Sequence, residues 1–200
     1  MNQIIFIRWW EAFYTDEQFY NYLKKIEYNP YKVKKSWRDW IAWSLSENFE
    51  VFEPIMPCKA DAKYKAWKIW FEKLFPYLKD NKIILIWSSL WWLFLVKYLS
   101  ENNFPKNISE LHLVAPLFND EWLVNEYVWD FALDINKVSD IEKKANKVSL
   151  YFSEDDPVLP FKQHKYYKEL LKNSKFFIFQ DRWHFSQPAF PELLENIDKS

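Results

Sequence analysis

Residues 83–95 read Ile-Ile-Leu-Ile-Trp-Ser-Ser-Leu-Trp-Trp-Leu-Phe-Leu, and this stretch decides the fold. Its first four residues form a continuous apolar run, which is typical of a strand buried on both faces of a parallel sheet. The apolar residues after the two serines predict a helix over residues 90–100. The stretch therefore predicts a buried strand, a sharp turn at Ser88 and Ser89, and a helix.

Apolar runs alternate with amphipathic stretches along the rest of the chain. Strands are expected at residues 3–7, 49–52, 82–86, 110–114, 147–152 and 176–179. Helices are expected at residues 16–26, 36–45, 62–78, 90–100, 161–171 and 191–197. Thr15 and Ser36 are candidate N-caps for two of these helices. This alternation predicts a three-layer α/β fold, with a mostly parallel sheet of about six strands and helices on both faces.

The composition describes a single folded domain. A chain of 200 residues suits one domain with a sizeable core, and residues 1–200 are expected to form it. Within it, residues 116–146 are a long connection and a candidate cap or lid. The formal net charge is −1, so electrostatics give no reason to expect nucleic acid or an anionic membrane as a partner.

Neither the apolar stretches nor the cysteine count points to a secreted or membrane protein. Residues 83–96 form the most apolar stretch and are too few to cross a bilayer. The short apolar run at residues 4–7 has no basic leader or small-residue cleavage site, so a cytoplasmic location is expected. The single cysteine, Cys58, rules out an intramolecular disulfide and a cysteine-based metal cage.

The chain contains no glycine but 13 tryptophans. Average composition predicts about 14 glycines for this length. Turns, helix ends and close backbone approaches favour a residue without Cβ, and proline does not replace glycine there. We therefore expect several tryptophans to stand at positions that are typical of glycine.

The turn after the strand at residues 82–86 has the pattern of a nucleophile elbow. With glycine at the tryptophans, residues 87–92 would read Gly-Ser-Ser-Leu-Gly-Gly, which contains Gly-x-Ser-x-Gly in the required strand–turn–helix setting. The elbow needs glycine two residues before and after the nucleophile because strand and helix approach closely there. Ser89 is therefore the candidate nucleophile, and Trp87 and Trp91 occupy the glycine positions.

Two further residues complete a candidate catalytic triad. Hydrolases with this elbow carry a serine, an acid and a histidine in that order along the chain. Asp156 and His184 each follow a predicted strand, so both belong to the edge of the sheet where open α/β folds hold their sites. Ser89 would be the nucleophile, His184 the general base and then acid, and Asp156 the group that orients the imidazole. Asp155 is the alternative acid.

Four more segments extend the pattern beyond the elbow. They are Ile-Arg-Trp-Trp at residues 7–10, Pro-Ile-Met-Pro at 54–57, Asp-Asp-Pro-Val-Leu-Pro at 155–160 and Asp-Arg-Trp-His-Phe at 181–185. In this order they resemble the small α/β-hydrolase-fold serine hydrolases related to retinoblastoma-binding protein nine. The family's Asp-Asp-Pro-x-x-Pro motif favours Asp156, which directly precedes Pro157, over Asp155.

The oxyanion hole of such a site uses backbone N–H groups. Leu90, the residue after the candidate nucleophile, would supply one of them. The loop after the first strand would supply the second, from Trp9 or Trp10. A tryptophan side chain in that loop can block the approach of an acyl carbonyl, and Arg8 departs from the histidine or proline that is commoner there in the family.

Motifs and resemblance together predict a serine hydrolase that cleaves small carboxylic esters through an acyl-enzyme. Its partner would be a small-molecule ester, without cofactor, metal, nucleic acid or membrane. We expect a monomer, with a dimer as the alternative. A second hypothesis from another class is a catalytically inactive protein of this fold that acts as a protein-binding module, which a site filled with tryptophan would suit.

Ten of the 13 tryptophans fall into two groups; of the others, Trp122 and Trp129 are further candidate glycine positions and Trp43 is undecided. Those at positions where the family has glycine are Trp9, Trp10, Trp87, Trp91, Trp92 and Trp183, whereas Trp37, Trp40, Trp67 and Trp70 have helical spacing that is typical of genuine tryptophan. With only three arginines among 27 basic residues, the composition indicates AT-rich coding. Our hypothesis is that UGA codons for glycine were read as tryptophan, and deliberate replacement of glycine by tryptophan is the alternative. UGG codons at Trp87, Trp91 and Trp183 would contradict the hypothesis. As written, the chain is expected to fold poorly or to hold a distorted, inactive site.

Overall fold

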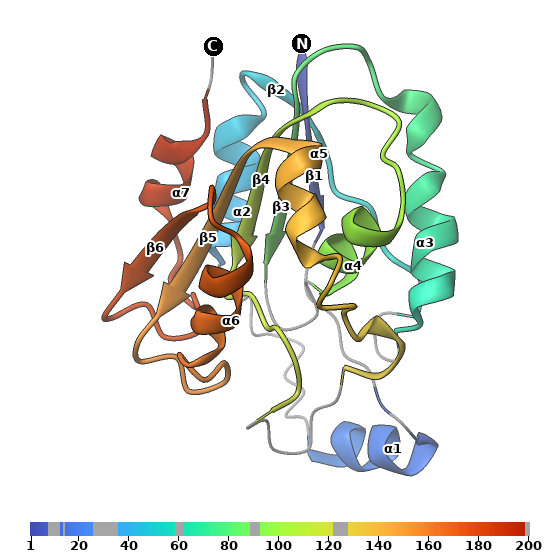
Figure 1. Cartoon of the computed structure of the whole chain (residues 1–200), viewed down its shortest axis with the longest axis vertical. Coiled ribbons are helices and arrows are strands. Elements are labelled where there is room, and N and C mark those ends of the chain that lie inside the picture. Colours follow the sequence, from blue (N-terminus) through green and yellow to red (C-terminus); the bar gives the residue numbers. More distant parts are fainter. Residues whose placement is uncertain are drawn as a thin grey trace.

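The computed structural model describes residues 1–7, 13, 15–25, 36–58, 62–88, 93–121 and 128–198. Six strands form one sheet in the order β2-β1-β3-β4-β5-β6 (Figure 1). Every neighbouring pair is parallel. The strands are β1 (Asn2–Ile7), β2 (Phe49–Phe52), β3 (Ile83–Ser88), β4 (Ile108–Val114), β5 (Ala145–Ser153) and β6 (Lys175–Phe179). The predicted parallel sheet is therefore confirmed.

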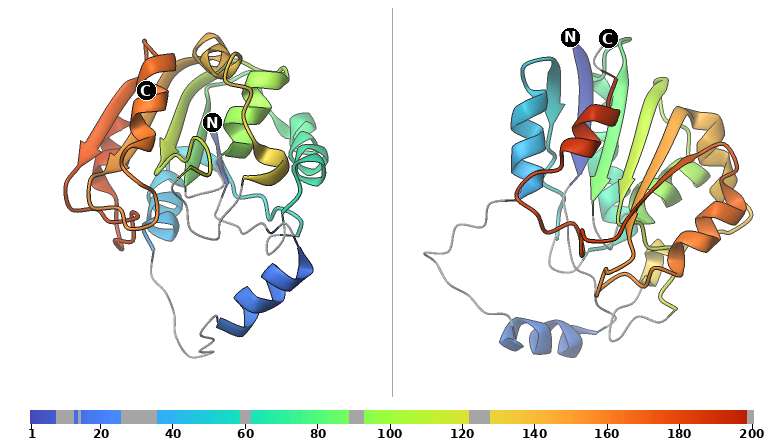
Figure 2. Two further views of the ribbon diagram at one scale, coloured as in Figure 1. Left: turned by 60° about the horizontal axis from the view of Figure 1, so that its bottom comes forward. Right: turned by 90° about the vertical axis from the view of Figure 1, so that its left-hand side faces the viewer.

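Helices cover both faces of the sheet (Figure 2). One face carries α2 (Trp37–Leu45) and α7 (Pro191–Asn196), and the other carries α3 (Tyr64–Glu72), α4 (Leu93–Glu101), α5 (Ile141–Lys144) and α6 (Gln163–Leu170). A further helix, α1 (Asp16–Lys25), lies beyond the carboxyl ends of the strands and buries none of its residues. This arrangement confirms the three-layer α/β prediction.

The core is built on β3, whose six residues are all buried. Its side chains alternate between the two helical layers, as the pleat requires. Trp87 contacts Trp67 of α3, while Ser88 contacts Arg38 of α2. The continuous apolar run in the sequence thus marks a strand that is covered on both faces.

Two helix boundaries are explained by local chemistry. Thr15 caps α1 reciprocally with Gln18, because the Gln18 N–H donates to Thr15 Oγ1 (3.2 Å) and the Thr15 N–H donates to Gln18 Oε1 (3.3 Å). The helix predicted for residues 62–78 ends at Glu72 instead. A short 3₁₀ turn follows at Phe75–Tyr77, since Pro76 lacks the N–H that a continued helix would use.

Described parts of the 116–146 connection form short elements that pack on the body of the fold. Besides α5 they are η2 (Trp129–Phe131) and η3 (Val138–Asp140), and Phe131 and Val138 are fully buried. Elements of three or four residues are too short to show a hydrophobic period, which is why the sequence predicted only an irregular connection here. A cap or lid function for this connection stays a prediction.

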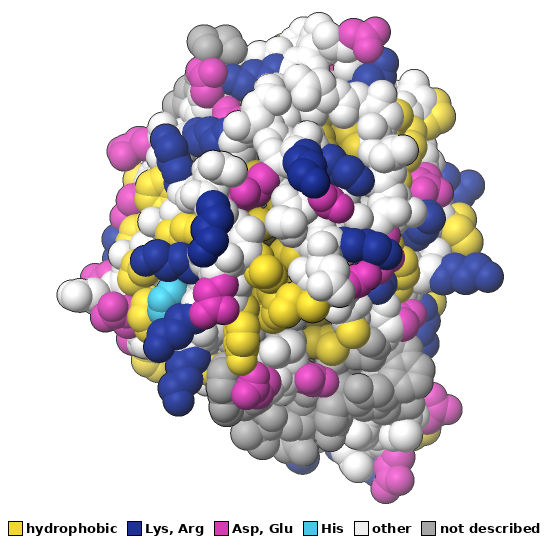
Figure 3. Space-filling view, in the orientation of Figure 1, with side chains coloured by type: hydrophobic (Ala, Val, Ile, Leu, Met, Phe, Trp, Pro, Cys, Tyr) yellow, Lys and Arg dark blue, Asp and Glu magenta, His cyan; other side chains and the backbone are white. Residues whose placement is uncertain are grey.

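The surface carries mixed charge. In Figure 3, Lys and Arg side chains are interspersed with Asp and Glu over the face in view, in keeping with the near-zero net charge. None of the helices that the structure describes is both long enough and apolar enough to span a bilayer.

A buried polar cluster lies near the start of β4. The Glu110 carboxylate accepts hydrogen bonds from Lys147 Nζ (2.7 Å) and from the Asp198 N–H (3.0 Å). His112 contacts the same carboxylate through Nε2 (3.1 Å) and Tyr151 Oη through Nδ1 (2.9 Å). Because an ionised carboxylate only accepts, the neutral His112 ring carries its proton on Nε2. The cluster joins β4 and β5 to the end of the chain.

This cluster predicts a loss of stability on acidification. Burial lowers the pKa of His112 in the folded chain. Below about pH 6.5 the imidazole is therefore protonated in the unfolded chain but stays neutral in the folded chain. Burial alone would raise the pKa of Glu110, but hydrogen bonds from His112 and Lys147 outweigh it and lower that pKa to about 2. The contribution of Glu110 is therefore present above about pH 4.3 and lost as the pH falls towards 2.

Urea unfolding at a series of pH values measures this effect. The free energy of unfolding should fall as the pH drops below about 6.5, by at most about 1.4 kcal/mol per pH unit for the single proton of His112. His112→Gln should flatten the curve between about pH 6.5 and 5. Equal slopes for the variant and its parent in that interval would show that His112 is not the titrating group.

Candidate active site

The strand order places the topological switch point of the sheet at the carboxyl ends of β1 and β3. β1 lies between β2 and β3, so the connections that leave β1 and β3 run to opposite sides, as at the ligand-binding switch point of open α/β sheets. Ile7 and Trp87 form the last residue pair between these two strands. Ser89, Leu90, Trp9 and Trp10 follow them in sequence and lie outside the described residues, as do Trp91 and Trp92.

The structure brings Asp156 and His184 together. Asp156 Oδ2 lies 2.8 Å from His184 Nδ1. The other carboxylate oxygen, Oδ1, accepts hydrogen bonds from the backbone N–H groups of Val158 and Leu159, each at 2.8 Å. The Asp156 side chain is 1% exposed and that of His184 is 17% exposed. The buried Asp156 carboxylate, which takes part in three hydrogen bonds, thus fixes the imidazole through Nδ1, so that Nε2 is the ring nitrogen facing away from the carboxylate.

Helix α2 holds the loop that carries His184. Trp37, the first residue of α2, donates from its indole Nε1 to the carbonyl of Phe185 at 2.8 Å. Its backbone N–H donates to the carbonyl of Gln187 at 3.1 Å. Trp37 is fully buried and its ring lies edge-on to Phe190, so the His184 loop is anchored to the core.

Asp155 has a different role from Asp156. Its Oδ1 accepts hydrogen bonds from Ser153 Oγ (2.6 Å) and from the backbone N–H of Trp183 (2.8 Å). The bond from Ser153 lowers the pKa of Asp155 and keeps the carboxylate ionised. Asp155 therefore ties the end of β5 to the loop after β6, while Asp156 contacts the imidazole.

Trp183 has the backbone conformation of a glycine. Its φ is 48°, in the left-handed region that a residue with Cβ enters at a cost of about 1–2 kcal/mol. Its side chain gains little in return, because the residue is 62% exposed. Glycine would fit position 183 without strain, as it would at Cys58, Ala115 and Phe185, which have similar φ values.

Trp87 also differs from the tryptophans with helical spacing. The indole N–H groups of Trp37 and Trp67 donate to the carbonyls of Phe185 (2.8 Å) and Pro57 (2.9 Å). Trp87 is equally buried, yet its Nε1 has no hydrogen-bond partner in the part of the chain that the structure describes. An unpaired buried donor typically costs about 1–3 kcal/mol, so position 87 accommodates a tryptophan poorly.

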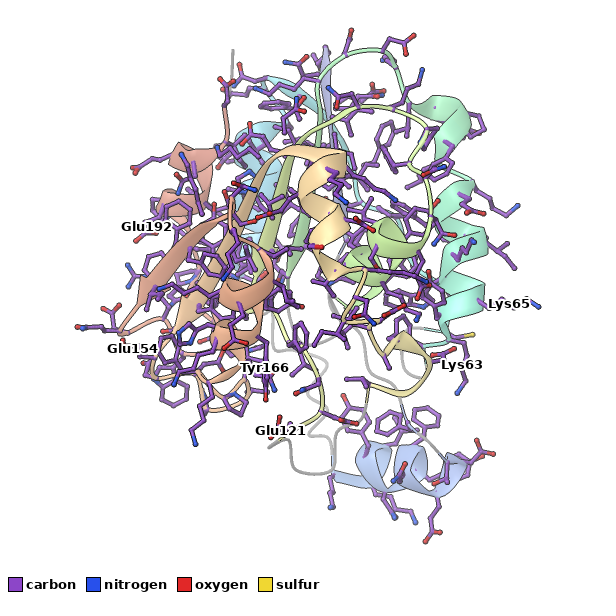
Figure 4. The ribbon with its side chains drawn as sticks, in the orientation of Figure 1. Lys63, Lys65, Glu121, Glu154, Tyr166 and Glu192 are labelled. Atoms are coloured by element: carbon purple, nitrogen blue, oxygen red, sulfur yellow. The ribbon has the colours of Figure 1, made fainter. Side chains whose placement is uncertain are left out.

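Gln163 connects α6 to the start of the 116–146 connection. Its buried side-chain Oε1 accepts from the Phe118 N–H (2.9 Å), and its Nε2 donates to the Glu121 carbonyl (3.1 Å). Tyr166, one helical turn further on, donates to the Glu121 carboxylate, and Figure 4 shows these two side chains close together near the carboxyl edge of the sheet. No sequence signal predicted this role of Gln163, because its partners are mostly backbone atoms.

Solved structures with this architecture are hydrolases and related proteins. The ydeN gene product of B. subtilis superposes with a TM-score of 0.69 at 15% identity, over 98% of this chain and 96% of that one. A serine hydrolase from Cycloclasticus zankles gives 0.66 at 9% identity, over 100% and 89%. The chain has an α/β-hydrolase fold. The ferulic-acid-bound Est1E of Butyrivibrio proteoclasticus gives 0.61 at 12% identity, over 97% and 85%.

At these identities the likeness establishes the α/β-hydrolase fold alone. No protein-family model and no curated protein sequence matches the chain. The narrower resemblance to hydrolases related to retinoblastoma-binding protein nine stays a prediction. Within the α/β-hydrolase fold, Asp156 and His184 stand at the carboxyl ends of neighbouring strands, where proteins with such sheets hold their sites.

Proposed function

We propose that the protein is a serine hydrolase that cleaves small carboxylic esters with a Ser89-His184-Asp156 triad. The hydrogen bond of 2.8 Å between His184 Nδ1 and the buried Asp156 carboxylate is the observation that carries this proposal. It pairs a histidine with its orienting acid in an α/β-hydrolase fold, and Ser89 follows β3 directly in the sequence. Esterases among the structural neighbours support the class of reaction.

The proposed reaction proceeds through an acyl-enzyme. Ser89 Oγ attacks the ester carbonyl carbon while His184 Nε2 takes its proton, and Asp156 stabilises the imidazolium. The tetrahedral intermediate expels the alcohol, which receives the proton from His184. Water, deprotonated by the same nitrogen, then attacks the acyl carbon, and collapse of the second intermediate releases the acid and reprotonates Ser89 Oγ.

The negative oxygen of each intermediate needs hydrogen-bond donors. We assign the backbone N–H groups of Leu90 and of Trp9 or Trp10 to this oxyanion hole, since their chain positions follow the neighbouring strands β3 and β1. Removal of one such donor typically costs about 10²–10³ in rate. The chemistry uses no metal and no cofactor.

Hydrolysis of p-nitrophenyl acetate and butyrate tests the proposal. In the chain with glycine at positions 9, 10, 87, 91, 92 and 183, in which we expect an undistorted site, Ser89→Ala should lower kcat/KM by at least about 10³-fold, because the nucleophile is removed. Ser46→Ala is the matched control, since Ser46 is exposed just after α2 and its hydroxyl bonds only within that turn. The assignment of Ser89 would be contradicted if Ser89→Ala kept its activity, or if Ser46→Ala lost activity to the same extent.

One observation favours a second candidate function, a catalytically inactive protein-binding module. Trp183 is 62% exposed directly beside His184 in the sequence, and exposed tryptophans are enriched at protein-binding hot spots. This function predicts a folded chain without ester hydrolysis, and Ser89→Ala would then leave all ester rates at the background level. Ester hydrolysis that depends on Ser89 decides against it.

A further inference from the structure

A charged hydrogen bond joins α2 to the end of β3. Arg38, the second residue of α2, donates from its Nε to the Oγ of Ser88 at 2.6 Å. Ser88 is the last residue of β3 and is fully buried. A bond from an ionised donor is typically about twice as strong as a neutral one, so this contact is a firm tether on the strand end.

The tether acts at a critical point in the chain. Ser88 immediately precedes Ser89 in the sequence, so the torsions at Ser88 set the direction in which the chain leaves the strand. Among the described residues, Ser88 also pairs with Val114 at the end of β4 in the sheet register. The Arg38 bond therefore restrains the last residue of β3 that pairs with β4.

The same turn of α2 also holds the histidine loop. The Arg38 guanidinium carbon lies 5.2 Å from the ring centroid of Trp37, and the indole N–H of Trp37 donates to Phe185, the residue after His184. Two adjacent residues of one helix thus contact both the segment before the candidate nucleophile and the segment after the candidate base. This shared support fixes the two segments relative to each other.

We propose that Arg38 is a positioning residue for the nucleophile. Its Nε–H bond to Ser88 Oγ sets the backbone of the strand end so that Ser89 enters the turn in reach of His184. This inference rests on the proposed hydrolase function, and it assigns Arg38 no contact with the substrate. Because an arginine guanidinium stays ionised in proteins, the bond to Ser88 should persist at every pH at which the activity is measured.

Hydrogen–deuterium exchange tests the tether independently of activity. In the full chain, Arg38→Gln and Ser88→Ala should each speed exchange in peptides that cover residues 83–95. Ser100→Ala, a matched removal of a buried hydroxyl that donates to the Lys97 carbonyl within α4, should leave this segment unchanged. Unchanged exchange in both Arg38→Gln and Ser88→Ala would overturn the proposal.

Ester kinetics on the same variants test the positioning role. Arg38→Gln and Ser88→Ala should each lower kcat by about 10- to 100-fold, with KM changed by less than about 3-fold and an unshifted pH profile. The double variant should lose no more than Arg38→Gln alone, because Arg38→Gln already removes the bond that Ser88→Ala breaks. Ser88→Thr keeps the hydroxyl and should retain most of the turnover.

The two failures are distinguishable. Additive losses in the double variant, or full turnover in Ser88→Ala, would overturn the role of Arg38 while Ser89-dependent hydrolysis persists. A parent chain without Ser89-dependent hydrolysis would instead overturn the proposed function, and with it the catalytic part of this inference. The exchange measurement would still decide whether Arg38 holds the end of β3.

Discussion

Asp156→Asn should lower the turnover of ester hydrolysis by about 10⁴-fold while the protein stays folded. The amide can still face His184 Nδ1, but its NH₂ donates where the carboxylate accepts, which favours the wrong imidazole tautomer. It also removes the charge that stabilises the imidazolium. Initial rates with a p-nitrophenyl ester, together with a thermal unfolding curve, measure both parts of the prediction.

Asp155→Asn provides the adjacent control. Asp155 accepts hydrogen bonds from Ser153 and the Trp183 backbone and does not contact the imidazole, so its replacement should change turnover by less than about 10-fold. It should loosen the loop after β6 instead. The reverse ranking of the two variants would show that the wrong carboxylate has been assigned.

Glycine at positions 9, 10, 87, 91, 92 and 183 together should raise the rate of ester hydrolysis at least about 10³-fold. Glycine at 183 fits the φ of 48° without strain, and glycine at 87 removes a buried N–H without a partner. We expect the change to free the surroundings of Ser89 and to let two backbone donors converge on one oxyanion, each typically contributing about 10²–10³ in rate. Initial rates on the chain as written and on the six-site variant measure the gain.

Trp70→Gly is the control for this experiment. Trp70 is 44% exposed on α3, where its spacing is typical of genuine tryptophan, so glycine there should give no gain and cost about 1 kcal/mol of stability. If the chain with its present tryptophans and the variant with glycine at six positions were both well folded and equally active, the interpretation of these tryptophans as displaced glycines would be contradicted.

The sheet was predictable because its signal is local. Four consecutive apolar residues at 83–86 identified the buried strand, which the structure extends to Ser88 through pairing with Leu113 and Val114 of β4. Likewise, Asp156 and His184 could be placed together because each follows a strand and parallel neighbouring strands end at the same edge.

Contacts that join distant segments were not predictable from the sequence. Arg38 meets Ser88 only because α2 packs on the face of the sheet to which Ser88 points. Glu110 and His112 interrupt an apolar strand, and their partners Lys147 and Asp198 become neighbours only when β5 and the chain end are in place. Such pairs depend on the tertiary arrangement, which neither propensity nor periodicity records.

Covalent labelling with a fluorophosphonate probe tests the central claim most directly, because the probe reacts with an activated serine. The full chain with glycine at positions 9, 10, 87, 91, 92 and 183, incubated with the probe and digested, should carry the adduct on Ser89 in mass spectra. Labelling should disappear in Ser89→Ala and slow by orders of magnitude in His184→Ala, with Ser46→Ala unchanged. A folded six-site glycine variant that takes up no probe, or takes it up equally after Ser89→Ala, would contradict the account.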